Sequence, residues 1–165
     1  MRVACICVAG ILTVTLGSCS KEHGLLPQVQ VGDATGVITT PVLLDQELHQ
    51  CSRMSPAGDA TPARLSQSDL KEFESSVPAF VAAHPPARMN NRVENLGSYY
   101  RRYAGLNRNG HRLMYASFIT THLSGAPSDW RAPTFGACGG GINFFGVEYD
   151  LDTHEFTHIA YNSEL

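Results

Sequence analysis

The spacing of hydrophobic positions changes along this chain. A continuous apolar run covers residues 3–16 and follows the basic residue Arg2. Further on, apolar residues recur every three to four positions in 70–81, and from about Tyr99 onward they tend to alternate with polar ones. These three patterns are typical of a secretion signal, an amphipathic helix and half-buried β-strands, respectively.

The helical pattern begins near Ser66, which stands three residues before Asp69 in the spacing of a capping box. Pro85, followed by a second proline, ends it. A short helix is also expected within residues 43–50. The stripe that would face the core consists of Leu70, Phe73, Val77, Phe80 and Val81.

The alternating patterns predict a sheet in the second half of the chain. Asn109-Gly110 is a strong signal for a tight hairpin, because both positions favour positive φ. The expected strands are 99–104, 113–119, 134–150 with a break at the three glycines, and 156–162. The simplest assembly is an α+β fold, with one main helix packed on an antiparallel meander of about four strands. By analogy, this outline suits a cystatin-like fold.

The apolar run ends in Leu16-Gly17-Ser18-Cys19, which resembles the lipobox of bacterial lipoproteins. The resemblance implies that Cys19 is lipid-modified and becomes the first mature residue. It predicts a signal peptide at 1–18, a flexible tether at 19–41 and a globular domain at 42–165. The protein would then sit in the cell envelope, held to a membrane by lipid and facing the periplasm. Whether that membrane is the inner or the outer one is left open.

This assignment accounts for the five cysteines. Cys5 and Cys7 leave with the signal peptide, and Cys19 carries the lipid. Cys51 and Cys138 remain in an oxidising compartment and are expected to form a disulfide, the alternative being two buried thiols. Paired in this way, Cys138 has no thiol with which to act as a nucleophile.

The composition and net charge of the chain limit the kinds of molecule that it is expected to bind. The chain is 43% hydrophobic and 16% charged, as globular domains are. Without the signal peptide, 11 basic residues face 15 acidic ones, for a net charge of −4 with neutral histidines. A mildly acidic domain without basic clusters is a poor ligand for nucleic acid.

One string, residues 154–158, matches the H-E-x-x-H motif of zinc proteases literally. On a helix, His154 and His158 would share a zinc ion, with Glu155 as general base and Glu164 as a third ligand. The flanking residues favour a strand, however, and four strand residues span about 13 Å, too far for two imidazoles to bind one ion. A hairpin turn with two surface histidines is therefore the favoured interpretation.

Residues 99–103, Tyr-Tyr-Arg-Arg-Tyr, allow two interpretations. They could form an exposed stacking surface for a glycan or a peptide. The favoured interpretation is a half-buried strand with its aromatic rings inward and its arginines outward.

The C-terminal part resembles a group of small proteobacterial lipoproteins and secreted proteins with the pattern C-D-G-G…F-F-G-V-E-Y-D…F-x-x-L-A-F-N. The matching segments here are Cys138–Gly141, Phe144–Asp150 and Phe156–Asn162, preceded by Trp130. The chain departs from the pattern at Gly139, where the group has Asp. The resemblance implies an exported protein and brings no activity with it.

Together, these patterns predict a non-catalytic cell-envelope lipoprotein that acts as a binding or accessory module. Its ligand is left open among envelope protein, glycan and lipid, and no cofactor is expected. The alternatives are a small zinc-dependent hydrolase that uses the 154–158 string and a purely structural lipoprotein.

Overall fold

A computed structural model of the protein describes residues 24–87, 91–122 and 130–164. The predicted signal peptide and the lipidation site Cys19 lie outside the described residues. No helix in the described ranges has both the length and the apolar character needed to cross a membrane.

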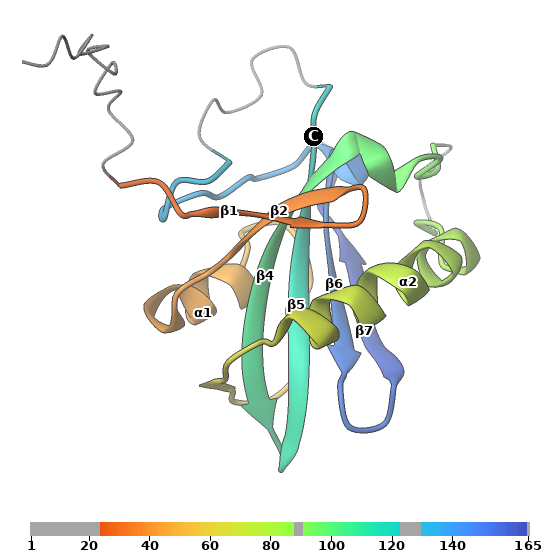
Figure 1. Ribbon diagram of the computed structural model, residues 1–165. Coiled ribbons are helices and arrows are strands. Elements are labelled where there is room, and N and C mark those ends of the chain that lie inside the picture. The colour runs from red at the N-terminus through yellow and green to blue at the C-terminus, as the bar shows by residue number, and fades with distance from the viewer. Residues whose placement is uncertain (1–23, 88–90, 123–129, 165) are drawn as a thin grey trace, which may run out of the picture.

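One sheet organises the molecule (Figure 1). Its seven strands lie in the order β1-β2-β4-β5-β6-β7, and β3 also pairs with β4. All pairs are antiparallel except β2 with β4, which run parallel. The strands are β1 Gln28–Val31, β2 Ala34–Ile38, β3 Thr61–Pro62, β4 Tyr99–Arg108, β5 His111–Thr120, β6 Phe144–Asp150 and β7 Glu155–Tyr161.

Helix α2 (Gln67–Ala83) covers one face of the sheet. The predicted capping box is present: the Ser66 hydroxyl accepts a hydrogen bond from the Asp69 amide, and the Asp69 carboxylate accepts one from the Ser66 amide. The helical stripe packs against aromatic and aliphatic residues of the central strands. This core comprises Leu70, Phe73, Val77, Val81, Tyr103, Met114, Ala116, Phe118, Phe145, Val147 and Tyr149.

The opposite face is covered by the short helix α1 (Leu44–Leu48) and by loops. Its apolar contacts come from residues that alternate with the α2-facing ones, such as Leu113 and Tyr115 on β5. The β4–β5 hairpin turns at Asn109-Gly110, where both residues have positive φ, as predicted. The β6–β7 turn lies at the same end of the sheet (Figure 1).

The expected α+β fold with one helix on about four strands is wrong, and so is its cystatin-like outline. The chain is predominantly β, with a seven-stranded sheet and two α-helices in its described part. The difference arises mainly at residues 28–38, inside the predicted tether, which form β1 and β2. There Gly36 does not supply flexibility: a Cβ at this position would lie 2.6 Å from Cε2 of Tyr103 on the neighbouring strand β4.

The predicted disulfide between Cys51 and Cys138 is confirmed. It joins the segment after α1 to the loop before β6, across 87 residues. Hydrogen bonds reinforce the junction: Gly139 donates its amide proton to Ser52 Oγ at 2.7 Å, and Asn162 donates to the carbonyl oxygens of Ala137 and Gly139.

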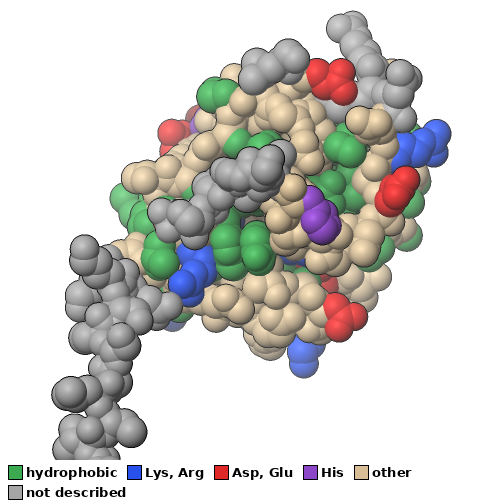
Figure 2. All heavy atoms as spheres, turned by 90° about the horizontal axis from the view of Figure 1, so that it is seen from above, with side chains coloured by type: hydrophobic (Ala, Val, Ile, Leu, Met, Phe, Trp, Pro, Cys, Tyr) green, Lys and Arg blue, Asp and Glu red, His purple; other side chains and the backbone are tan. Residues whose placement is uncertain are grey.

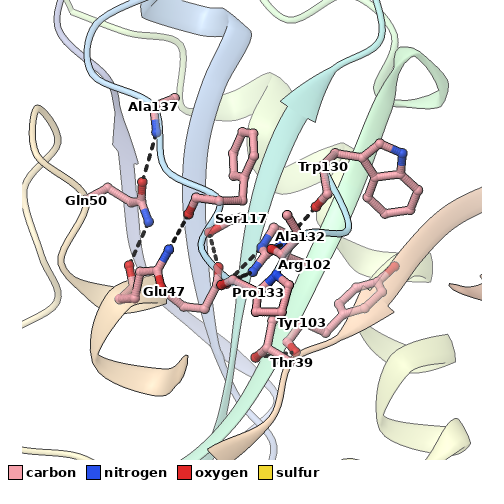
Figure 3. A network of polar contacts seen from close by, with 12 residues as sticks. Thr39, Glu47, Gln50, Arg102, Tyr103, Ser117, Trp130, Ala132, Pro133 and Ala137 are labelled. Atoms are coloured by element: carbon pink, nitrogen blue, oxygen red, sulfur yellow. Dashed lines mark hydrogen bonds and ion pairs between the residues drawn. The ribbon is translucent and has the colours of Figure 1, made fainter. Parts of the chain in front are cut away.

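A buried ion pair fixes α1 on the sheet (Figure 3). Arg102 of β4 has no exposed surface, and Glu47 of α1 is 1% exposed. Arg102 Nε donates to Glu47 Oε1 at 2.8 Å, while its Nη1 donates to the carbonyl oxygens of Trp130 and Ala132, both at 2.8 Å. Ser117 of β5 donates to the other carboxylate oxygen. One guanidinium therefore joins the sheet, the helix and the loop that follows Trp130.

Replacing Glu47 with glutamine leaves Arg102 as a buried charge without a counter-ion. We expect the free energy of unfolding to fall by about 3–5 kcal/mol, measured by urea denaturation. Glu94, which is exposed and forms no ion pair with any described residue, provides the control: Glu94→Gln should change stability by less than about 0.5 kcal/mol. Equal effects of the two substitutions would show that the pair does not hold α1 in place.

Candidate functional site

A cleft of about 420 Å³ lies on the α1 face, at the end of the sheet where the hairpins turn. Its polar side chains come from all four strands β4 to β7, and the loop residues Pro56 and Ala57 line it as well. We call it the polar cleft; its polar lining consists of Arg108, Asn109, His111, Glu148, Asp150, Thr157 and His158.

Arg108 and Glu148 form the buried centre of the polar cleft. Arg108 is 7% exposed and Glu148 is 2% exposed. Arg108 Nη1 lies 2.7 Å from Glu148 Oε1 and 2.5 Å from Oε2. The other guanidinium nitrogens, Nε and Nη2, are buried and have no partner among the described residues. Buried donors without acceptors are rare and unfavourable, so this side chain has unused binding capacity.

A β-bulge directs two further side chains into the polar cleft. Glu148 of β6 pairs with His158 of β7, while the next residue, Tyr149, pairs with Phe156. Thr157 is therefore the extra residue, and its hydroxyl donates to Glu148 Oε1 at 2.9 Å. Bulges commonly re-aim side chains at functional sites.

His158 is held by the loop that follows the disulfide. Its Nε2 lies 3.0 Å from the carbonyl oxygen of Met54, which can only accept, so the ring carries its proton on Nε2. Burial lowers the pKa of His158 below its usual value of about 6.5, against the opposing effects of the Met54 hydrogen bond and Glu148. Because this pKa lies below 6.5, the neutral form of the ring predominates at pH 7.

The H-E-x-x-H string is divided between a turn and a strand. His154 lies in the β6–β7 turn with φ 61° and contacts Glu72 of α2 through Nδ1. His158 lies on β7 and contacts the loop on the other side of the sheet. Glu164 lies beyond the end of β7 and is exposed. The predicted strand after the turn is confirmed, and the residues do not form the helix on which zinc proteases place this motif.

Residues 99–103 match neither expectation fully. Their tyrosines Tyr99 and Tyr103 are buried, as the strand interpretation requires, but the arginines are not outward. Arg101 is 3% exposed and forms an ion pair with Glu74 of α2, with Nη2 and Oε2 3.2 Å apart. Tyr100 is half-buried and stacks on Trp130 with ring centroids 4.2 Å apart. The segment is therefore occupied by internal contacts.

A larger hollow of about 680 Å³ lies between α2, the β1–β2 turn and residues 93–97. Two of its charged residues, Arg101 and Glu74, pair with each other; Asp33, Lys71 and Glu94 line it as well. None of the buried, unpartnered side-chain atoms of the described residues belongs to its lining. The polar cleft has such atoms, so we regard it as the better candidate site.

Sequence reasoning missed Arg108, Glu148 and Asp150. A signal was present for Glu148, because a carboxylate inside the apolar run Phe-Phe-Gly-Val-Glu-Tyr must either interrupt the strand or find a buried partner. The identity of that partner, 40 residues earlier in the chain, depends on strand register.

The chain matches no protein-family model, no curated protein and no solved structure. The candidate site therefore depends on its own geometry.

The lowered pKa of His158 has a measurable consequence for stability. Between pH 6.5 and the lower folded pKa, the unfolded chain binds more protons at this residue than the folded chain does. This contribution to stability is present above pH 6.5 and is lost as the pH falls through that window. In an NMR titration we expect the midpoint of His158 to lie below 6.5 when folded and to return to about 6.5 in urea. A folded midpoint at or above 6.5 would mean that attraction to Glu148 outweighs burial.

Proposed function

We propose that this protein is a lipid-anchored module of the bacterial cell envelope that binds a ligand in the polar cleft without converting it chemically. The observation that carries the proposal is Arg108: a buried guanidinium that lines the polar cleft and has two donor nitrogens without a partner in the described part of the chain. The N-terminal pattern that ends in Cys19 supports the envelope location. The Cys51–Cys138 disulfide supports an oxidising compartment.

The hydrogen bonds of the polar cleft favour binding over catalysis. The Glu148 carboxylate already accepts hydrogen bonds from Arg108 and Thr157. Asp150 Oδ1 accepts the amide protons of Asp152 and Thr153. A general base needs a free lone pair within reach of a substrate proton, and these carboxylate oxygens are engaged by the protein itself.

The unused donors of Arg108 define the class of ligand. Guanidinium N–H groups pair best with carboxylate or other anionic oxygens. We therefore propose a ligand with an accessible carboxylate, such as a uronic acid of an envelope glycan or the end of a peptide. Nucleic acid is disfavoured by the net negative charge. On the face seen in Figure 2, positive and negative side chains are scattered and form no patch of one sign.

Lipidation at Cys19 is tested by substitution. The wild-type chain, expressed with labelled palmitate in a bacterial host, should incorporate label and remain in the membrane fraction. Cys19→Ser should incorporate no label, because serine has no thiol to form the thioether. Cys7→Ser, inside the predicted signal peptide, is the matched control and should retain the label. Labelled Cys19→Ser protein would contradict the proposed anchor.

Ligand binding is tested with glucuronate as the probe carboxylate. In the full chain, purified in detergent, the Nε–H resonance of Arg108 should shift on titration with glucuronate. Arg108→Lys keeps the charge beside Glu148 but loses the planar fork, so we expect binding to weaken about tenfold. Arg112→Lys changes an exposed arginine and should leave binding intact.

A shift confined to the hollow beside α2 would contradict the assignment of the polar cleft as the site. If neither glucuronate nor an acetylated dipeptide produces any shift, and no envelope component is captured by the wild-type chain, the protein is a structural lipoprotein and the proposal is wrong.

A further inference from the structure

Three potential metal ligands meet at the rim of the polar cleft. His111 is the first residue of β5, Asp150 is the last residue of β6, and Asp152 lies in the turn that follows. One ligand atom from each residue lies within 4.8 Å of the other two. The antiparallel pairing of β5 with β6 brings them together, although 39 residues separate His111 from Asp150 in the sequence.

The backbone orients both carboxylates. The amides of Asp152 and Thr153 donate to Asp150 Oδ1 at 2.8 and 3.0 Å, and the amide of Arg112 donates to Asp152 Oδ2 at 2.8 Å. One oxygen of each carboxylate is thus held by the backbone, and the other oxygen of Asp150, Oδ2, contacts His111. Carboxylates that are already oriented by hydrogen bonds lose less conformational entropy when they bind a metal ion.

Distances suit a small ion. Asp150 Oδ2 lies 2.8 Å from His111 Nδ1. Around a tetrahedral zinc ion with bonds of about 2.0–2.1 Å, neighbouring ligand atoms are about 3.3 Å apart. The His111–Asp150 spacing is shorter than that value, and all three ligand atoms lie within 4.8 Å of one another, so metal binding requires small side-chain adjustments at the exposed residues His111 and Asp152.

Charge provides a separate argument. No lysine or arginine side chain among the described residues pairs with Asp150 or Asp152. The nearby cations are already engaged elsewhere, Arg108 with Glu148 and Arg112 with Asp69. Asp150 is 6% exposed, so its negative charge is largely buried; among the described residues its side-chain contacts are two backbone amides and the His111 ring. Buried carboxylates usually pair with a cation or coordinate a metal.

The neighbouring guanidinium is an independent sign that this corner of the molecule takes a ligand. Arg108 is more than nine-tenths buried and lines the same cleft as His111 and Asp150. Two of its donor nitrogens have no partner among the residues that the structure describes. Arg108 is the residue of β4 that pairs with His111 of β5, so the guanidinium and the imidazole come from adjacent backbone positions. Sites for anionic groups often combine a guanidinium with a divalent ion.

We propose that His111, Asp150 and Asp152 bind one divalent transition-metal ion of the Zn²⁺ or Mn²⁺ type. One imidazole and two carboxylates form a mixed nitrogen and oxygen set that suits these ions. Ca²⁺ requires six to eight oxygen ligands and binds more weakly here. Three protein ligands leave a coordination position open to solvent at the rim of the polar cleft. The ion site does not depend on the carboxylate ligand proposed above.

The test uses the full chain in detergent, freed of metal with a chelator and titrated with Zn²⁺ or Mn²⁺ in a calorimeter. We expect one ion per chain. Asp152→Asn keeps an acceptor for the Arg112 amide but removes the charge, and His111→Gln removes the imidazole. Each should weaken binding at least about tenfold. Bound Mn²⁺ should also broaden the backbone resonances around residues 111 and 152 in the unmodified chain, which locates the ion without any variant.

Two matched controls separate this site from its neighbours. His154→Gln removes an exposed histidine that also contacts a carboxylate, Glu72, and should leave the affinity unchanged. Arg108→Lys should weaken glucuronate binding but not metal binding, so the two proposals fail independently. Absence of stoichiometric binding overturns the metal site. An equal loss in His154→Gln or His158→Gln also overturns it and places the ion in the H-E-x-x-H string instead.

Discussion

The interaction on which most of this structure depends is the buried pair of Arg102 and Glu47. Removing two charges from water is unfavourable, and the cost is offset only when the remaining donors and acceptors are satisfied. Here Arg102 also donates to two carbonyl oxygens, and the Ser117 hydroxyl donates to the second carboxylate oxygen of Glu47. The pair fixes α1, and α1 leads directly to Cys51 and to the loop that forms a wall of the polar cleft. The position of a functional surface is thus set by a contact in the middle of the sheet.

Three buried ion pairs involve arginines of strand β4, one on the α2 face of the sheet and two on the opposite face. Arg101 pairs with Glu74 on the α2 side, whereas Arg102 and Arg108 pair with Glu47 and Glu148 on the other side. Shifting β4 by one residue would move every arginine to the face that lacks its carboxylate. Breaking a buried pair costs about 3–5 kcal/mol, far more than losing one apolar contact, so these pairs specify strand register as much as they stabilise the fold.

Some elements of the fold could be predicted from short stretches of sequence, and others could not. The capping box at Ser66, the Asn109-Gly110 hairpin and the Cys51–Cys138 pair were predictable, because each depends on neighbouring residues or on the number of available cysteines. Strands β1 and β2 were not, because each is four or five residues long and contains or adjoins a glycine that resembles linker sequence. The polar cleft was not predictable either, since its residues come from four strands whose register only the folded sheet defines.

The 154–158 string shows how backbone geometry decides what a motif does. On a helix, its two histidines would lie on one face and share an ion. Here it spans a turn and a strand with a bulge at Thr157, and the histidines diverge: His154 reaches Glu72 of α2, and His158 reaches Met54 on the opposite side. An edge strand is thereby tied to both layers that cover the sheet. The residues that meet a metal's requirements lie one strand away, where two backbone-anchored carboxylates approach His111. A metal site in this protein is therefore recognised by ligands that lie close together in the folded structure, and not by a match to a sequence motif.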